Sequence, residues 1–430
     1  MYHGVHTFHG YDKEKVMPAE RVELRGHIID SLTLAKVLDL IITRGAEYTV
    51  VEIDIGKTQL DPSRVLLEVG SDDPELLQSL LIDLHSQGAN RLETQEATLE
   101  PCAQDGVLPE DFYSTTNLPT KVLVSGKWLE VEYPEMDCAI VIDSSSLSAG
   151  DTPQATAVPM HKVRTGDMVV VGDHGVVVEP IVESHESASF HFMSSQASSE
   201  KPKRLIVAKV AERIMATRQL TPPGDVLAVC GPAAIHTGAG QSLARLIRDG
   251  WITMLFAGNG FATHDLESNI LGTSLGVSLR EGNQTESGHS NHLRVINEIR
   301  KLGSIQNAVE KGYLKSGVLY ECVVNGVPYV LGGSLRDDGP LPDVMTDVVQ
   351  ATDRMRELRA NVNLAIMLAT TLHAIAVGNI LSSKVETFCV DINQAVVTKL
   401  SDRGSHQTVG IVTDVGLFIS ELADILSPQA

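Results

Sequence analysis

Residues 224–276 constrain the fold most, because they read as a complete strand–helix–strand unit. An apolar strand ends in the glycine-bearing turn CGPAAIHTGAG, and the predicted helix Gln241–Asp249 then places Leu243, Leu246 and Ile247 on one face. A second apolar strand ends in another glycine turn. Strand–helix alternation continues to the C-terminus, so we expect residues 201–430 to form a doubly wound, Rossmann-like α/β domain.

The turn after the first strand of this unit suits a phosphate group. Small residues let a backbone approach a ligand closely, and the helix start that follows supplies free N–H groups and a positive dipole end. A pyrophosphate is therefore expected against Ala233, Ala234, Thr237 and Gly238. The spacing differs from GxGxxG, so an ordinary crossover turn without a ligand is the alternative.

Small or polar residues also follow the later strands, where doubly wound sheets bind their ligands. The further cofactor candidates are Gly258, Asn259, Gly260, Gly333, Ser334, Asp391, Asn393, Thr413 and Asp414. An acidic residue at a strand end can accept hydrogen bonds from ribose hydroxyls. Structural turns and helix capping are the alternatives at these positions.

The densest polar cluster is GGSLRDDGPLPD, residues 332–343. Arg336 can hold a carboxylate or phosphate with two hydrogen bonds, and either Asp337 or Asp338 can act as a base. We favour Asp338 because it lies beside Gly339, and a solvated acidic turn is the alternative. His264 in ATHD can relay a proton near neutral pH, unless it is a capping or core histidine.

The order strand, helix, two strands, helix in the first 115 residues predicts a ferredoxin-like module. A strand leads into a helix that begins at Asp30 or Ser31 as N-cap and ends before Gly45. Two strands follow, and a second helix begins with Asp73 as N-cap and Pro74 at the first helical position.

Residues 116–200 predict a small β-rich domain and a linker, because short apolar runs alternate with glycines and prolines before a Ser- and His-rich stretch. If this domain closes over the nucleotide-binding domain, its charged residues can contact a substrate. The candidates are Glu135, Asp137, Lys162 and Arg164, with solvated rim charges as the alternative.

Composition restricts the partners. The chain has 34 Lys and Arg against 55 Asp and Glu, a formal net charge of −21, which argues against nucleic acid or an anionic membrane as partner. Five scattered cysteines without CxxC spacing indicate neither zinc nor disulfides and fit a reducing cytoplasm. The HxxH pair His289 and His292 lacks an acidic ligand pattern, so no metal is expected. Neither a membrane span nor a secretory signal is expected.

The segment RVELRGHIIDSLTLAKVLDLII resembles the conserved region of the bifunctional lysine-ketoglutarate reductase/saccharopine dehydrogenase enzymes (LOR/SDH). The resemblance continues through GKWLEVEYPEMDCAIVID, VPMHKVRTGDMVVVG, GNGFATHDLESNILGTSLG and LGGSLRDDGPLPDVMTD, and so spans the chain from about residue 20 to the end. The full layout is similar to archaeal-type ornithine cyclodeaminases and to the C-terminal half of cyanobacterial arginine dihydrolase/ornithine cyclodeaminase enzymes. The nucleotide-binding domain also resembles that of deoxyhypusine synthase.

This resemblance implies an enzyme that uses tightly held NAD to convert ornithine into proline and ammonia, with the hydride returned within each turnover. It also implies a functional use for Gly258, Asn259 and Gly260. Because a guanidine-removing domain is missing, arginine is not an expected substrate. Lysine differs from ornithine by one methylene, so the sequence does not rank the two.

Other functions stay open. They are an NAD-dependent amino-acid dehydrogenase, an amine transferase on the same fold, and a non-catalytic sensor of NAD or an amino acid. Pairing of sheet edges through the N-terminal module makes a homo-oligomer the expected assembly.

Overall fold

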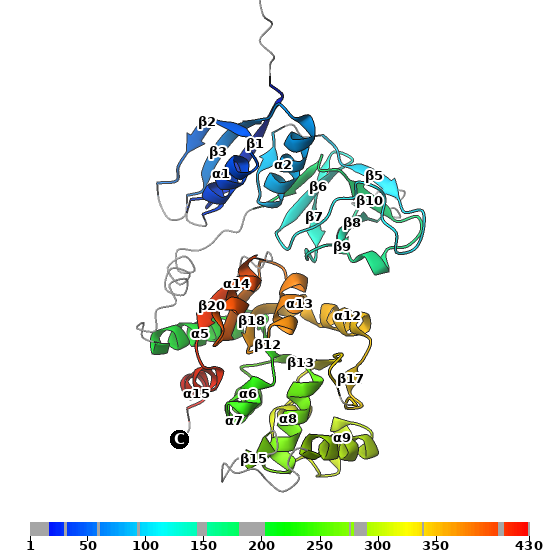
Figure 1. Cartoon of the computed structure of the whole chain (residues 1–430), viewed down its shortest axis with the longest axis vertical. Helices are drawn as coiled ribbons and strands as arrows, with labels where there is room; N and C mark the ends of the chain where they lie inside the picture. The colour runs from blue at the N-terminus through cyan, green and yellow to red at the C-terminus, as the bar shows by residue number, and fades with distance from the viewer. Residues whose placement is uncertain are drawn as a thin grey trace, which may run out of the picture.

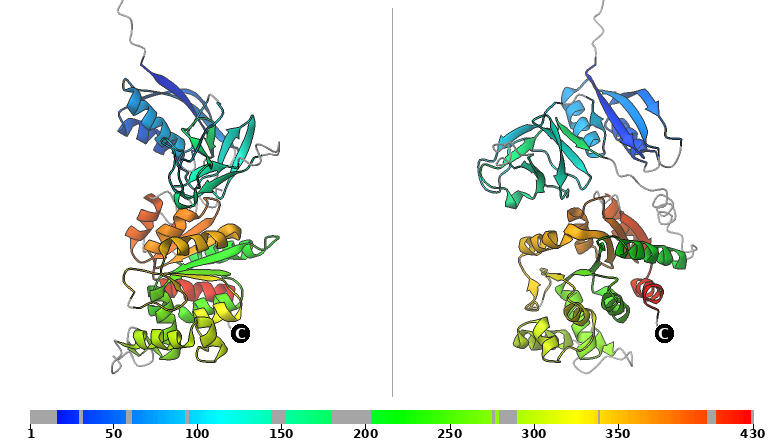
Figure 2. Two further views of the ribbon diagram at one scale, coloured as in Figure 1. Left: turned by 90° about the vertical axis from the view of Figure 1, so that its right-hand side faces the viewer. Right: turned by 180° about the vertical axis from the view of Figure 1, so that it is seen from behind.

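Among the described residues, three large sheets with their helices and one two-stranded sheet, β14 (Thr273–Ser274) with β15 (Val277–Ser278), make up the molecule. The computed structural model describes residues 17–29, 32–57, 61–92, 95–143, 153–179, 203–274, 277–278, 290–337, 339–402 and 408–428. The N-terminal module and the β-rich domain lie side by side at one end, and the nucleotide-binding domain forms the other end (Figures 1 and 2).

The N-terminal module confirms the ferredoxin-like prediction. Its elements are β1 (Ala19–Gly26), α1 (Thr33–Thr43), β2 (Glu47–Asp54), β3 (Ser63–Gly70), α2 (Pro74–Ser86) and β4 (Asn90–Arg91). The antiparallel sheet has the order β2-β3-β1-β4, with β2 at one edge. Buried residues of the strands pack against both helices and form one apolar core.

The two helices of this module begin differently. Asp73 caps α2 by accepting hydrogen bonds from the amides of Glu75 and Leu76, and Pro74 occupies the first turn, as predicted. The predicted N-cap of α1 is wrong: Leu32, in the left-handed conformation at φ 59°, precedes the first turn and makes no side-chain cap. Asp30 and Ser31 lie outside the described residues. Gly45 follows the end of α1 at φ 75°, as expected for a helix terminus.

The β-rich domain contains one seven-stranded sheet. Its strands are β5 (Thr98–Pro101), β6 (Thr120–Val124), β7 (Lys127–Glu132), β8 (Ala139–Ile142), β9 (Ala155–Val158), β10 (Met168–Val171) and β11 (Val176–Val178). Their order is β11-β6-β7-β9-β8-β10-β5, and all pairs are antiparallel except β7 with β9. Alternate valines and isoleucines of these strands form a separate core.

The nucleotide-binding domain confirms the doubly wound prediction. Its parallel strands are β12 (Asp225–Cys230), β13 (Met254–Gly258), β16 (Tyr329–Gly332), β17 (Val344–Met345), β18 (Val362–Leu368), β19 (Glu386–Asp391) and β20 (Thr408–Val412). Their order is β17-β16-β13-β12-β18-β19-β20, which is the Rossmann order with β17 added at one edge. The order of connection therefore reverses between β12 and β18, where such sheets bind ligands.

Helices cover both faces of this sheet (Figure 1). One face carries α5 (Lys203–Arg218), α6 (Ala233–His236), α7 (Gly240–Arg248), α8 (Asn259–Ile270), α9 (Asn291–Leu302), α10 (Ile305–Glu310), α11 (Val318–Val324) and α15 (Val415–Leu426). The other carries α12 (Val348–Leu358), α13 (Leu372–Ile380) and α14 (Gln394–Asp402). The predicted stripe of Leu243, Leu246 and Ile247 on α7 is buried against the sheet. No helix among the described residues is long and apolar enough to cross a bilayer.

Candidate active site

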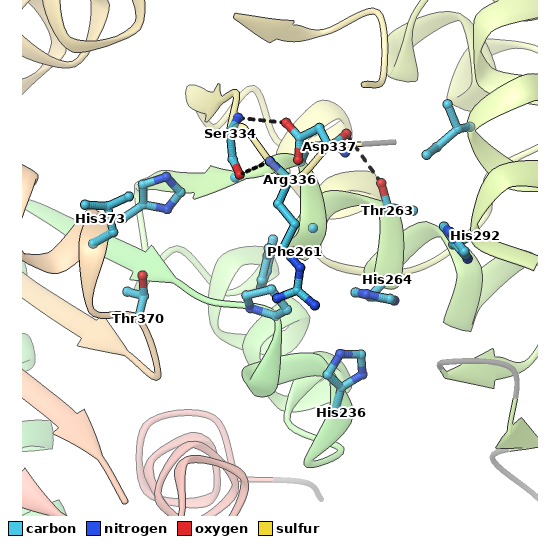
Figure 3. A pocket seen from close by; sticks show the side chains of 16 residues that line it. His236, Phe261, Thr263, His264, His292, Ser334, Arg336, Asp337, Thr370 and His373 are labelled. Carbon is cyan, nitrogen blue, oxygen red and sulfur yellow. Dashed lines mark hydrogen bonds between the residues drawn. The ribbon is translucent and has the colours of Figure 1, made fainter. Parts of the chain in front are cut away.

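A pocket of about 700 Å³ opens at the carboxyl edge of the parallel sheet (Figure 3). Segments that follow β12, β13, β16 and β18 line it, together with α8 and α9. Its residues are Pro232, His236, Gly258, Asn259, Gly260, Phe261, Thr263, His264, His292, Ile296, Ser334, Arg336, Asp337, Thr370, Leu372 and His373. This volume is typical of sites for small ligands and cofactors.

The turn after β12 contains the short helix α6, so the predicted phosphate turn is more structured than a loop. Of the four residues predicted there, Ala234 is buried, Ala233, Thr237 and Gly238 are exposed, and their neighbours Pro232 and His236 line the pocket. A Cβ on Gly231, just before this helix, would lie 1.9 Å from the carbonyl oxygen of Ala369. The backbones that follow β12 and β18 therefore touch at the switch point.

Gly258, Asn259 and Gly260 end β13, begin α8 and line the pocket. Asn259 is buried, and its Oδ1 accepts a hydrogen bond from the amide of Leu341 at 3.1 Å. It therefore ties the stretch after β16 to α8. A Cβ on Gly260 would lie 3.2 Å from Cγ of Pro232, so this glycine lets α6 and α8 approach each other.

His264 begins a chain of polar contacts that leads from the pocket through Glu267 to Thr273. Its Nδ1 lies 3.2 Å from Oε2 of the buried Glu267, whose Oε1 accepts a hydrogen bond from Thr273 at 2.7 Å. The ring of His236 lies 4.4 Å from that of His264, centroid to centroid. Burial and His264 lower the pKa of His236, and Glu267 opposes this. If Nδ1 of His264 donates to Glu267, its Nε2 is left as an acceptor.

The loop after β16 brings Ser334, Arg336 and Asp337 to the pocket. Asp337 Oδ2 accepts from the amide of Ser334 at 2.8 Å, and Ser334 Oγ accepts from the amide of Arg336 at 3.0 Å. The Arg336 side chain extends into the pocket (Figure 3), and among the described residues its guanidinium has no ion-pair partner. Gly333 packs against Thr346 outside the pocket lining. Asp338 lies outside the described residues.

Thr370, Leu372 and His373, which sequence reasoning missed, complete the pocket from the end of β18. They follow the apolar run NLAIML, so the strand-end rule applied to the other strands could have found them. Burial lowers the pKa of His373, and the nearby Asp337 carboxylate opposes this shift.

The predicted cofactor residues after β19 and β20 do not line this pocket. Asp391 is buried and accepts from the amide of Asn393, and Asn393 accepts from the amide of Ala395 at the start of α14. Asp414 caps α15 by accepting from the amide of Leu417, beside the buried Thr413. The side chains of Asp391, Asn393 and Asp414 thus accept hydrogen bonds from amides just before or within the first turn of a helix, as the capping alternative expects.

The four predicted substrate contacts on the β-rich domain also lie outside the pocket lining. Glu135 is buried between Arg356 and Arg359, with distances of 3.0 Å and 2.7 Å. Lys162 pairs with Asp353 at 3.1 Å. Arg164 lies 3.8 Å from Asp105, and Asp137 is exposed. Glu135 and Lys162 therefore join the β-rich domain to α12 and the residues after it, instead of facing an open cleft.

No group of three His, Cys, Asp or Glu side chains in the described part of the chain is arranged to hold a metal ion. His292 lines the pocket, whereas His289 lies outside the described residues. All five cysteines are buried free thiols.

Three family models match consecutive parts of the chain. Residues 19–118 match the LOR/SDH bifunctional enzyme conserved region. Residues 119–207 match the first region, and residues 208–422 the Rossmann fold, of the C-terminal part of arginine dihydrolase ArgZ-like proteins.

Whole-chain comparisons agree with these matches. The chain is 50% identical over 412 residues to ornithine cyclodeaminase from Methanopyrus kandleri, covering 96% of this chain and 97% of that protein. It is similar to the apo structure of cyanobacterial ArgZ, an arginine dihydrolase, with 36% identity and a TM-score of 0.81 over 95% of this chain and 58% of that chain. It is also similar to AgrE in its ternary complex with ornithine and NAD⁺, with 39% identity and a TM-score of 0.51 over 95% of this chain and 57% of that chain. The chain therefore belongs to the family formed by the archaeal ornithine cyclodeaminases and the C-terminal region of ArgZ-like arginine dihydrolases.

Proposed function

We propose that this protein is an NAD-dependent ornithine cyclodeaminase, which converts L-ornithine into L-proline and ammonia. The observation that carries this proposal is the 50% identity to an enzyme of that name across 96% of the chain. The pocket at the switch point of the Rossmann sheet supports it, because it provides one continuous space for a nucleotide and a small substrate.

The residues of the pocket fit NAD. Pro232 and His236 from the turn after β12 line it together with Gly258 and Gly260, and Arg336 supplies a cation. The similarity to AgrE, a protein solved with ornithine and NAD⁺, supports the same cofactor and substrate here. When bound, NAD would accept a hydride from the α-carbon of ornithine and return it to the cyclic imine that becomes proline.

The side chains of the pocket have separate tasks in this proposal. Arg336 binds an anionic group, either the substrate carboxylate or the pyrophosphate. The sequence predicts Asp338, Asp337 and His264 for proton transfer, and of these Asp337 and His264 line the pocket. Ile296 and Leu372 supply apolar surface beside a reactive imine.

The five free thiols support a reducing cytoplasm as the location.

Incubating the purified protein with L-ornithine and a trace of NAD tests the proposal. We expect proline and ammonia in equal amounts, far exceeding the NAD added, and a slower reaction with L-lysine. Accumulation of NADH in proportion to product would instead identify a dehydrogenase. Bound NAD without any product would favour a sensor and contradict the proposal.

A further inference from the structure

His373 occupies a recess that two glycines create at the ends of neighbouring strands. It is the second residue of α13, and its imidazole reaches the last residues of β13 and β16. A Cβ on Gly258 would lie 2.7 Å from Cε1 of this ring, and a Cβ on Gly332 would lie 3.7 Å from Nε2. A side chain at position 258 would therefore displace the imidazole, so this backbone is shaped around the ring.

The surroundings of the ring favour its neutral form, in which one ring nitrogen is a hydrogen-bond acceptor. It is half-buried, and burial holds its pKa below the ordinary value of 6.5, against the opposing effect of Asp337. Within the described part of the chain neither ring nitrogen has a hydrogen-bond partner. His264 differs, because Glu267 engages its Nδ1.

The proposed reaction needs such a group. Ornithine carries two ammonium groups, and an ammonium nitrogen must lose a proton before its carbon releases a hydride or before it attacks an imine. Proline and an ammonium ion together carry as many protons on nitrogen as ornithine does. A base that takes up a proton early in the turnover is therefore regenerated when ammonia leaves.

We propose that His373 is a catalytic proton acceptor that contacts the substrate amine, and that Asp337 stabilises the imidazolium formed. This inference rests on the proposed function. In the step, one N–H bond of the substrate ammonium breaks and one N–H bond forms on the imidazole. The electron pair stays on the substrate nitrogen, so nothing is oxidised or reduced. The proton returns to the nitrogen that departs as ammonia.

Substitution of the ring tests the proposal kinetically. We expect His373→Gln to lower kcat about 100-fold or more, with KM for ornithine changed only a few-fold and NAD binding retained. Added imidazole should restore part of the activity of His373→Ala. Gly258→Ala should reproduce the loss, because its Cβ displaces the ring. His27→Gln, in the N-terminal module, is the matched control and should leave kcat unchanged.

The pH dependence gives a second readout that needs no His373 variant. The other titratable or charged side chains lining the pocket are His236, His264, His292, Arg336 and Asp337. Because Asp337 raises the pKa of His373, Asp337→Asn should move the acidic limb of the kcat/KM profile to lower pH. In the protein without NAD, the ring resonances of His373 in an NMR titration should shift when ornithine is added.

Each outcome decides one of the two proposals. If the wild type makes no proline from ornithine, the proposed function fails, and the NMR titration still reports whether an amine reaches the ring. If the wild type is active while His373→Gln keeps more than a tenth of kcat, the assignment of His373 is wrong. Loss of NAD binding in His373→Gln would likewise overturn it, because the ring would then serve the cofactor. If ornithine does not shift the ring resonances of His373, the assignment of His373 is also wrong.

Discussion

At the scale of single residues, Gly231 lies very close to the backbone of Ala369 in the nucleotide-binding domain. Their segments follow β12 and β18, and any side chain at 231 would meet a carbonyl oxygen at 1.9 Å. Backbone atoms cannot move aside as a flexible side chain can, so the two segments would have to separate. The shape of the switch point therefore depends on one missing Cβ.

Gly231→Ala should accordingly lower both stability and cofactor affinity. We expect a loss of about 1–3 kcal/mol in the free energy of unfolding. A fall of about tenfold in NAD affinity should accompany it, equivalent to about 1.4 kcal/mol. Thermal denaturation and fluorescence titration with NAD measure the two effects. Gly240→Ala is the control, because its Cβ meets only the flexible end of Ile235 at 3.3 Å. Equal effects of the two substitutions would contradict the prediction.

A second residue-scale prediction concerns His85 on α2, which is buried against the ring of Tyr113. Desolvation lowers its pKa to about 4 from 6.5. The unfolded chain therefore takes up this proton first as pH falls, and stability is lost between pH 6.5 and 4. The full loss is about 3 kcal/mol. His85→Gln should flatten the dependence of the melting temperature on pH in this window, measured by calorimetry, and an unchanged dependence would refute the assignment.

At the scale of elements, α12 and α13 join the nucleotide-binding domain to the β-rich domain. Arg356 of α12 and the neighbouring Arg359 hold the buried Glu135, and Arg359 also donates to the carbonyl of Ile380 at the end of α13. One residue earlier, the carbonyl of Asn379 accepts a hydrogen bond from the amide of Met136 at 2.9 Å. The β-rich domain thus contacts the same helix whose first turn carries His373.

Removal of the buried Glu135 carboxylate should lower the free energy of unfolding. Glu135→Gln leaves two arginines without their shared partner, and we expect a loss of about 3–5 kcal/mol in stability. The matched control is Arg354→Gln, which breaks an exposed pair with Glu357 on the same helix. Such surface pairs contribute about 0–1 kcal/mol. Chemical denaturation of both variants checks the difference, and similar midpoints would show that Glu135 is not a structural charge.

Elements determined by local chemistry could be predicted from the sequence. The cap at Asp73 and the stripe on α7 depend on residues within a few positions of one another. The strand-end rule could have placed His373 at the pocket, but the contact of its ring with Gly258 depends on the pairing of β18 with β12 and of β12 with β13. The sequence predicts Glu135 as a substrate contact because its two arginine partners are 221 and 224 residues away and cannot be identified from local sequence. Sequence periodicity carries no information on such distant pairings.

At the scale of the whole molecule, the free edge of the N-terminal sheet is the strongest candidate for assembly. All eight residues of β2 are exposed, and Tyr48, Val50 and Ile53 are among the exposed large hydrophobic residues. An exposed apolar edge strand favours pairing with another chain. A second copy of this chain is the expected partner, which gives a homo-oligomer.

Light scattering on the purified protein should therefore report more than one chain per particle. Ile53→Lys should lower that mass, because a charge then lies on the paired edge. Ile82→Lys places the same change on the exposed side of α2 and should leave the mass unchanged. A monomeric wild type would contradict the assembly.

The position of α13 has a consequence for anyone who wishes to shorten this protein. A fragment that starts at α5 would retain every residue lining the pocket, yet it would lose Glu135 and the amide of Met136. Two arginines would then be uncovered next to the helix that carries His373. Fusing the nucleotide-binding domain to a different N-terminal domain would therefore require a new carboxylate for the two arginines. It would also require a new amide donor at the C-terminal end of α13.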